Sequence, residues 1–286
     1  MNQFRTGGFQ MLPPVVKNLL IINVLLFLAT EVTLNLTGFD LRDTLGLHWF
    51  QSDKFAFYQP FTYMFMHGNF QHILFNMFAV WMFGNAIENV WGSKRFLTYY
   101  LITGLGAAAL HYGIAYFETI QNFNLLIDGF LQSPNAQTLG AFFADYKIQI
   151  DSTTSIGAAF NTAEPYLQHV LQGSTETADL EKAYAFMDAY KSHFLSSMNV
   201  IGASGSLFGI LLAFGMMFPN AELYMMFIPI PIKAKYFVAG YGAIELYSGI
   251  TGTSDGIAHF AHLGGLITGF ILIRIWQKFD SSFRLL

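Results

Sequence analysis

Long apolar runs separated by short polar stretches dominate the pattern of hydrophobic and polar positions along this chain. A helix that crosses a bilayer needs roughly 20 mostly apolar residues. Six runs approach this length, and we expect each to form a transmembrane helix: residues 15–36, 61–83, 96–116, 198–218, 235–251 and 257–276. The pattern therefore predicts an all-α membrane protein, built as a bundle of six transmembrane helices.

Proline residues indicate where several of these helices begin and end, because proline suits the first turn of a helix but not its interior. Pro14 opens the first run, Pro60 lies at the start of the second, and Pro219 ends the fourth. Two further prolines interrupt the stretch after Pro219. We therefore expect residues 219–234 to form a loop at the membrane interface.

A much more polar segment, residues 117–197, separates the third run from the fourth. It carries nine acidic residues against three lysines. We expect it to be an extracytoplasmic insert within a single membrane domain that spans residues 1–286. Apolar side chains at the spacing of one helix face predict an amphipathic helix in this insert: Leu180, Tyr184, Met187, Tyr190 and Phe194.

Composition agrees with the membrane assignment and excludes some chemistry. The chain is 53% hydrophobic and only 11% charged, whereas soluble domains are about 25% charged. It has no cysteine, so disulfides, thiolate metal ligands and a cysteine nucleophile are excluded. A net charge of -4 gives no indication of nucleic-acid binding.

The distribution of basic residues predicts the orientation. If the N-terminus is cytoplasmic and the spans alternate, nine of the 14 basic residues lie on the cytoplasmic side: Arg5, Lys17, Lys94, Arg95, Lys233, Lys235, Arg274, Lys278 and Arg284. Cytoplasmic loops carry such an excess. The first run lacks the charge cluster and the cleavage site of a signal peptide, so we interpret it as a retained span.

Ser204 lies in Gly202-Ala203-Ser204-Gly205, near the outer end of the fourth run. A rise of about 1.5 Å per residue would place it roughly 10 Å along that helix. The N-terminal end of a helix presents free N–H groups and favours developing negative charge. Taken alone the motif is weak, because close packing of small residues between membrane helices explains it equally well.

His262 adds a base to this hydroxyl. It lies among apolar residues of the sixth run, where a polar side chain must find a partner. Glycines at 205 and 209, and at 265 and 269, form two Gly-xxx-Gly patterns that allow helices to approach closely. If these faces meet, Ser204 and His262 reach hydrogen-bond distance, as a base-activated nucleophile requires. Helix packing alone also explains the glycines, so only the combination favours chemistry.

His72 and Asn76 are four residues apart on the second run and share a helix face. Both offer N–H donors of the kind that stabilise an oxyanion. Metal binding by His67, His72, His259 and His262 is the alternative, but the His-Glu-x-x-His spacing of a zinc protease is missing from the sequence. We therefore expect no metal and no cofactor.

Together, His72-x-x-x-Asn76, Gly202-Ala203-Ser204-Gly205 and Ala261-His262-x-x-Gly265-x-x-x-Gly269 resemble the motifs of the rhomboid intramembrane serine proteases, on the expected spans. The resemblance covers nearly the whole chain except the insert. Each motif is weak alone, whereas the set in this order is specific. It implies a six-span, rhomboid-like bundle of the bacterial type, located in the cytoplasmic (inner) membrane.

The resemblance also implies a role for each matching residue. Ser204 would be the nucleophile and His262 the general base, a dyad with no aspartate. His72, Asn76 and the Ser204 backbone N–H would stabilise the oxyanion. Phe208 stands where many bacterial members place a tyrosine that stacks on the histidine. The supporting residues implied in this way are His67, Gly202, Gly205, Phe208, Gly265 and Gly269.

By the same resemblance, the substrate is a single-pass transmembrane protein that enters from the bilayer between the second and fifth spans. It would be cut by a serine endopeptidase near the outer face of the membrane. No nucleic-acid partner is implied, and the sequence does not indicate the oligomeric state.

Two other functions fit parts of the sequence. A non-enzymatic relative would bind membrane clients without cutting them, but such proteins usually lack the serine or the histidine. A channel or transporter would use the histidines and Glu245 in the fifth run, yet we find no internal repeat that would support it. Glu245 is an intramembrane carboxylate and hence a functional candidate, but the sequence does not assign it to the site.

Overall fold

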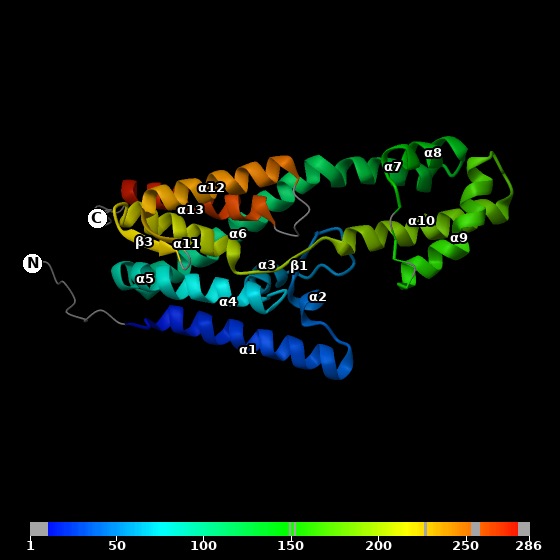
Figure 1. Ribbon diagram of the computed structural model, residues 1–286. Helices are drawn as coiled ribbons and strands as arrows, with labels where there is room; N and C mark the ends of the chain where they lie inside the picture. Colours follow the sequence, from blue (N-terminus) through cyan, green and yellow to red (C-terminus); the bar gives the residue numbers. More distant parts are fainter. Residues whose placement is uncertain (1–10, 149, 152, 226–227, 253–257, 280–286) are drawn as a thin grey trace, which may run out of the picture. The chain divides into compact units, whose positions relative to one another are not determined.

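The computed structural model describes residues 11–148, 150–151, 153–225, 228–252 and 258–279, and the following statements concern these residues. They fold almost entirely into helices (Figure 1). The chain divides into two compact units. The first comprises Met1–Leu47, Ala56–Tyr112 and Val200–Leu286, and the second comprises His48–Phe55 and Gly113–Asn199.

The first unit contains the apolar helices. Its main elements are α1 (Pro14–Thr37), α2 (Leu41–Leu45), α3 (Gln59–Thr62), the 3-10 turn η1 (Tyr63–Phe65), α4 (Phe70–Ala79), the π-helical turn η2 (Val80–Gly84), α5 (Asn85–Trp91), α6 (Ser93–Ala115), α11 (Ser204–Met217), α12 (Ala234–Thr251) and α13 (His259–Phe279). Short strands β1 (Leu47–His48) and β2 (Asn199–Val200) lie where the chain passes from one unit to the other.

Helix α1 illustrates how the sequence defines its own ends. Pro14 lies in the first turn, where proline is tolerated. Gly38 ends the helix with a φ of 72°, and its N–H donates to the Leu34 carbonyl. Only glycine adopts this left-handed conformation readily. The predicted span 15–36 therefore differs from α1 by one residue at each end.

The second predicted span, residues 61–83, is wrong in its limits. Residues 59–65 form the short helices α3 and η1, and the long apolar helix runs from Phe70 to Trp91 through α4, η2 and α5. Asn69 causes the late start, because its side chain accepts the N–H of His72 and caps α4.

The fourth predicted span, residues 198–218, is also wrong at its start. Helix α11 begins at Ser204 itself, so the serine does not lie 10 Å along the helix. Gly202 precedes the helix with a φ of 129°, which a helix cannot contain. Residues 199–200 belong to β2 instead. Ser204 therefore lies at the end where free N–H groups are exposed.

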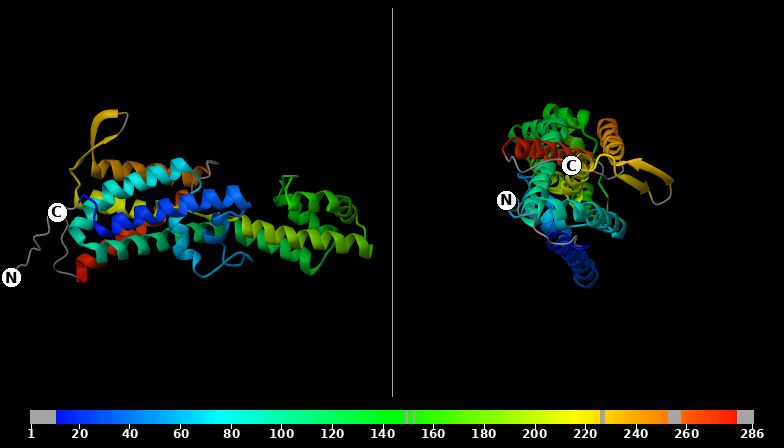
Figure 2. Two further views of the ribbon diagram at one scale, coloured as in Figure 1. Left: turned by 90° about the horizontal axis from the view of Figure 1, so that it is seen from below. Right: turned by 90° about the vertical axis from the view of Figure 1, so that its left-hand side faces the viewer.

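The described residues of the predicted loop 219–234 are mostly strand, and residues 226–227 of that loop lie outside the part of the chain that the structure describes. Strands β3 (Glu222–Met225) and β4 (Ile228–Lys233) pair as an antiparallel hairpin, with Glu222 opposite Lys233. The hairpin projects from the helices of its unit (Figure 2). Proline has no backbone N–H, and an edge strand tolerates it at positions that face away from the neighbouring strand, where no donor is needed.

Close approach of α11 and α13 forms the centre of the first unit. A Cβ atom built at Gly265 would overlap the Gly205 carbonyl oxygen, and one at Gly269 would overlap the Tyr99 hydroxyl and lie 3.3 Å from Gly209 Cα. The two Gly-xxx-Gly faces thus meet. Removal of side-chain bulk lets the backbones touch, and the Tyr99 hydroxyl donates to the Gly209 carbonyl at 2.8 Å.

A buried carboxylate connects α5 to the start of α1. Glu88 accepts the backbone N–H groups of Val15 and Val16 at 2.9 and 2.8 Å, and the Ser93 hydroxyl at 2.6 Å. The free N–H groups of a helix N-terminus favour a negative charge at this place. Glu88 therefore has a structural role, because it connects α5 to the start of α1.

The second unit has its own apolar core. It contains the π-helical turn η3 (Tyr116–Ile120) and helices α7 (Gln121–Gln132), α8 (Ala136–Asp145), α9 (Ser155–Leu171) and α10 (Thr177–Ser197). Helix α10 is the predicted amphipathic helix, and Met187 and Tyr190 are buried as expected. Tyr184, however, is 41% exposed, because the buried stripe of α10 passes through Ala183 and Phe186 instead.

Three helices of the described residues are long and apolar enough to cross a membrane: Pro14–Thr37, Phe70–Trp91 and His259–Phe279. Helix α11 is apolar but shorter. Several apolar helices therefore agree with a membrane bundle, and the count of six spans stays a prediction. Arg5 and Arg284, which we used for the orientation, and residue 257 of the sixth predicted span lie outside the described residues.

We expect Gly265→Ala to lower the free energy of unfolding by about 1–3 kcal/mol, because the added methyl group has no room beside the Gly205 carbonyl. Thermal unfolding in detergent measures this change. Gly240→Ala is the matched control, since no atom lies within 4 Å of a Cβ built at Gly240. Equal melting temperatures of the two variants would contradict the role assigned to the glycine contact.

Candidate functional site

The central feature of the site is a contact between α11 and α13. Ser204 Oγ lies 2.9 Å from His262 Nε2, within hydrogen-bond distance. Ser204 is the first residue of α11, and His262 lies in the first turn of α13 with 8% of its surface exposed. Gly205 and Gly265 let the two helices approach closely next to Ser204 and His262. The same glycines therefore permit both the helix packing and the contact between the serine and the histidine.

Aromatic stacking fixes the plane of the imidazole. The Phe208 ring lies parallel to the His262 ring, with 4.2 Å between centroids and 8° between planes. Tyr241 of α12 stacks in turn on Phe208 at 5.2 Å. Phe208 thus lies one helical turn after Ser204, on the face that meets His262. It restricts rotation of the imidazole by stacking alone, since phenylalanine has no hydroxyl.

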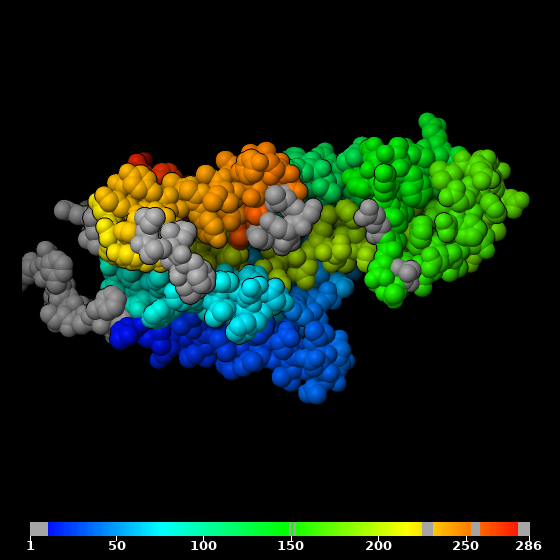
Figure 3. Space-filling model, viewed as in Figure 1, coloured from blue at the N-terminus to red at the C-terminus, as the bar shows by residue number. Residues whose placement is uncertain are grey.

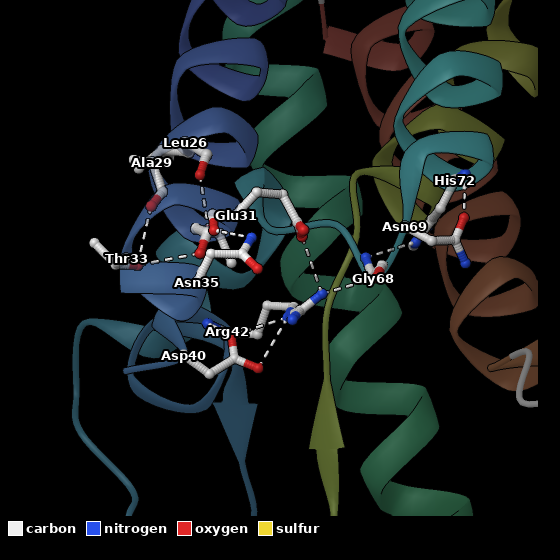
Figure 4. Close-up of polar contacts among 11 residues, drawn as sticks. Leu26, Ala29, Glu31, Thr33, Asn35, Asp40, Arg42, Gly68, Asn69 and His72 are labelled. Carbon is white, nitrogen blue, oxygen red and sulfur yellow. Dashed lines mark hydrogen bonds and ion pairs between the residues drawn. The ribbon is translucent and has the colours of Figure 1, made fainter. Parts of the chain in front are cut away.

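The segment before α4 is held by Arg42 (Figure 4). Its guanidinium donates to the Gly68 carbonyl at 2.9 Å and contacts the carboxylates of Asp40 and Glu31 at 2.9 and 3.5 Å. These contacts place Gly68 directly before the Asn69 cap of α4. The loop that carries His67 is therefore attached to residues 31–42 of the same unit.

His72 presents its Nε2 atom toward the serine. The Gly68 N–H donates to His72 Nδ1 at 3.4 Å, so Nε2 carries the ring proton in the neutral side chain. A Cβ built at Gly202 would lie 2.9 Å from His72 Nε2 and 3.5 Å from Ser204 Oγ. The positive φ of Gly202 and its missing side chain therefore leave the space between His72 and Ser204 open.

Asn76 lies one turn beyond His72 on α4 and is 5% exposed. Its Nδ2 atom is buried and has no hydrogen-bond partner among the described residues. Buried N–H groups are nearly always paired, so this donor fits a partner supplied from outside the chain. His67 packs its ring edge-on against His72, with 4.9 Å between centroids, and thus supports the position of that ring.

Sequence reasoning missed the role of a third side chain next to His262. Glu245 Oε2, on α12, lies 2.6 Å from His259 Nδ1 and 2.9 Å from His262 Nδ1. The first contact is a hydrogen bond, whereas the second lies outside hydrogen-bond geometry, so His262 Nδ1 faces the carboxylate without a formed bond. The i, i+3 spacing of His259 and His262 was the signal that both rings share one face of α13.

Glu245, His259 and His262 are also the residues that could hold a metal ion, since their ligand atoms lie within 4.8 Å of one another. Tetrahedral ligands at about 2.0–2.1 Å from zinc stand roughly 3.3 Å apart. The observed separations of 2.6 and 2.9 Å are shorter. They are the distances of a hydrogen bond and an ion pair, so the arrangement does not fit a metal centre without movement of the carboxylate.

The arrangement places a hydroxyl, a base, two side-chain N–H donors and the start of a helix within one apolar bundle. A hydroxyl that donates to an imidazole gains nucleophilic character as the proton moves. Donors on the other side of the hydroxyl stabilise negative charge that develops on a carbonyl oxygen. Acyl transfer is the reaction class that uses this combination.

The fold and the site define a multi-pass helical membrane protein with a serine–histidine pair. The chain matches the Rhomboid domain over residues 54–125 and 171–279, which is more than half of its length. It therefore belongs to the rhomboid family. The residues between the two matched segments, 126–170, belong to the second unit.

We expect Phe208→Leu to slow the reaction of Ser204 with a fluorophosphonate about 10-fold, because the imidazole loses the parallel ring that fixes its plane. The rate of labelling in detergent measures the effect. Phe270→Leu is the control, because Phe270 is 48% exposed on α13 and lies two turns from His262. Equal labelling rates for both variants would contradict a positioning role for Phe208.

Proposed function

We propose that this chain is an intramembrane serine endopeptidase that cleaves single-pass membrane proteins with Ser204 and His262. The observation that carries the proposal is the 2.9 Å contact between Ser204 Oγ and His262 Nε2 inside an apolar bundle. Membership of the rhomboid family supports it, because that family is typically proteolytic. The family also has inactive members, so the activity itself rests on the site.

In the proposed reaction, the Ser204 hydroxyl attacks a peptide carbonyl while its proton moves to His262 Nε2. The imidazolium then gives this proton to the leaving amine. Water hydrolyses the acyl-enzyme, with neutral His262 again accepting a proton. Phe208 keeps the ring parallel to its own plane during these transfers.

The oxyanion of the tetrahedral intermediate would lie on the α4 side of Ser204. His72 Nε2–H, Asn76 Nδ2–H and the Ser204 backbone N–H are the proposed donors. The first residue of an α-helix has no acceptor for its N–H within the helix, which leaves the Ser204 N–H available. The unpaired Asn76 donor supports the same placement.

The proposed substrate is a transmembrane helix that enters between α4 and α12. Helix α12 has few buried residues, namely Ala234, Val238 and Glu245, and packs on α11 and α13. Side chains of α12 and α4 reach the same face of the first unit (Figure 3). A weakly embedded helix beside the site is compatible with movement that admits a substrate.

We further propose six spans, a cytoplasmic N-terminus and a bacterial cytoplasmic membrane as the location. The basic residues Lys94, Arg95, Lys233 and Lys235 would then lie inside, as the positive-inside rule requires. Residues 117–197 would then form a lobe on the outer side of the membrane.

The test of the proposed function is cleavage of a single-span model substrate in liposomes. We expect Ser204→Ala and His262→Ala each to reduce cleavage at least about 10³-fold, since the two groups act as one unit. Ser206→Ala is the matched control. Ser206 lies two residues further along α11, and its buried hydroxyl contacts Met64 Sδ at 3.7 Å, away from His262.

Undiminished cleavage by the Ser204→Ala protein would refute the proposal. A wild-type protein that binds the substrate but neither cuts it nor reacts with a fluorophosphonate would instead support a non-catalytic member of the family. Proton or ion flux through liposomes that the Ser204→Ala variant retains would favour a channel.

We expect Asn76→Ala to lower kcat about 10²-fold with little change in KM, because the amide would bind the oxyanion and not the ground-state substrate. Steady-state cleavage assays measure both parameters. Asn89→Ala is a control in the same long helix segment, at a residue whose amide bonds to Asn85 and lies in α5. A rise in KM with unchanged kcat would contradict the oxyanion role.

A further inference from the structure

Glu245 is a buried charged group that the reaction above does not use. It is 5% exposed, and His259 and His262 beside it are 8% exposed. Burial of a carboxylate in an apolar bundle is costly unless the group is paired. Its two polar contacts among the described residues are imidazole nitrogens, and one of these imidazoles is the proposed base.

We propose that Glu245 is a positioning residue that prepares His262 for proton transfer, and that His259 holds the Glu245 carboxylate in place. The inference rests on the proposed function. It converts the expected serine–histidine dyad into a three-residue relay of contacts, from Ser204 on α11 through His262 on α13 to Glu245 on α12.

The first argument concerns the tautomer of His262. To accept the Ser204 proton, Nε2 must be unprotonated, so the neutral ring must carry its proton on Nδ1. A carboxylate 2.9 Å from Nδ1 favours a proton at that nitrogen and disfavours the opposite tautomer. Without the carboxylate, Nε2–H would compete, and a ring in that form cannot act as the base.

The second argument concerns charge. When the Ser204 proton moves to Nε2, the ring becomes an imidazolium in a medium of low dielectric constant. A carboxylate beside Nδ1 stabilises this cation, and the attraction does not require the linear geometry of a hydrogen bond. The Nδ1 proton stays on His262 and is not transferred to Glu245, which remains ionised throughout the cycle.

The third argument concerns orientation. His259 Nδ1–H donates to Glu245 Oε2 at 2.6 Å, so the carboxylate is fixed by the residue one turn before His262. Phe208 restrains the face of the His262 ring, and Glu245 contacts its edge. The two neighbours therefore restrict different movements of the same imidazole.

Glu245→Gln tests the inference because glutamine keeps the shape and removes the charge. We expect kcat to fall about 10–100-fold with KM within a factor of about two, and the labelling of Ser204 by a fluorophosphonate to slow to the same extent. Glu222→Gln, at an exposed carboxylate in β3, is the matched control. Thermal unfolding in detergent checks that both variants fold.

Glu245→Asp separates charge from shape. If the charge matters, aspartate restores more activity than glutamine, although it is shorter. If Glu245 only fills space, glutamine is the better replacement, and that order would overturn the inference. Activity of the wild type must also survive EDTA, because loss of cleavage with the chelator would assign the three side chains to a metal ion instead.

Nitrogen-15 NMR of histidine-labelled protein reports the tautomer of His262, which a purely structural role of Glu245 would leave unchanged. We expect wild-type His262 in the Nδ1–H form and Glu245→Gln with an increased share of the Nε2–H form, the signal being assigned by its loss in His262→Gln. An unchanged tautomer together with unchanged kcat would overturn the inference. Cleavage that depends on Ser204 would leave the proposed function intact in that case, whereas cleavage independent of Ser204 would remove both.

Discussion

The contact of two helix backbones at paired glycines is the constraint on which the site depends. Gly205 and Gly209 on α11 face Gly265 and Gly269 on α13. A Cβ at Gly265 would overlap the Gly205 carbonyl on the opposite helix, and Cβ atoms at the other three positions would overlap side chains of α6, which packs against both helices. Between membrane helices there is little hydrophobic driving force, so close van der Waals contact has to hold them together. The same approach brings Ser204 to within 2.9 Å of His262. The small residues that close helix packing requires are therefore also those that the contact between Ser204 and His262 requires.

Caps, loop contacts and a glycine at the starts of the helices position the side chains of the candidate site. The Asn69 cap begins α4 in a position that directs His72 and Asn76 inward, and Arg42 holds the loop before it. Gly202, with its φ of 129°, follows β2 and allows α11 to start at Ser204. These devices are strand, turn and cap features in a chain that otherwise consists of apolar helices. The segments that precede α4 and α11 thus define where the candidate site residues lie along these helices.

The sequence predicted much of this arrangement, and its failures have physical causes. Apolar length located α1, α12 and α13 to within a few residues, since the bilayer fixes the length of a span. It failed at residues 61–69, where two short helices end before the Asn69 cap starts α4, and at residues 198–203, where the positive φ of Gly202 delays the start of α11. The spacing of Ser204, His262, His72 and Asn76 identified the candidate site. The contact of Glu245 with His262 was not predictable, because it depends on how α12 packs on α13 and no local pattern records that packing.

Some buried polar groups of the bundle are paired within the protein, and one proposed oxyanion donor is not. Glu88 accepts hydrogen bonds from the N-terminus of α1 and from Ser93. The Tyr99 hydroxyl donates to the Gly209 carbonyl. The polar atoms in these bonds are therefore already paired within the protein. Asn76 Nδ2 is different, because it is buried without a partner in the described chain. An unpaired donor in an apolar interior costs free energy that another group must offset. A carbonyl oxygen that becomes negative next to Ser204 would supply that compensation, and it would do so most strongly in the transition state, where catalysis requires it.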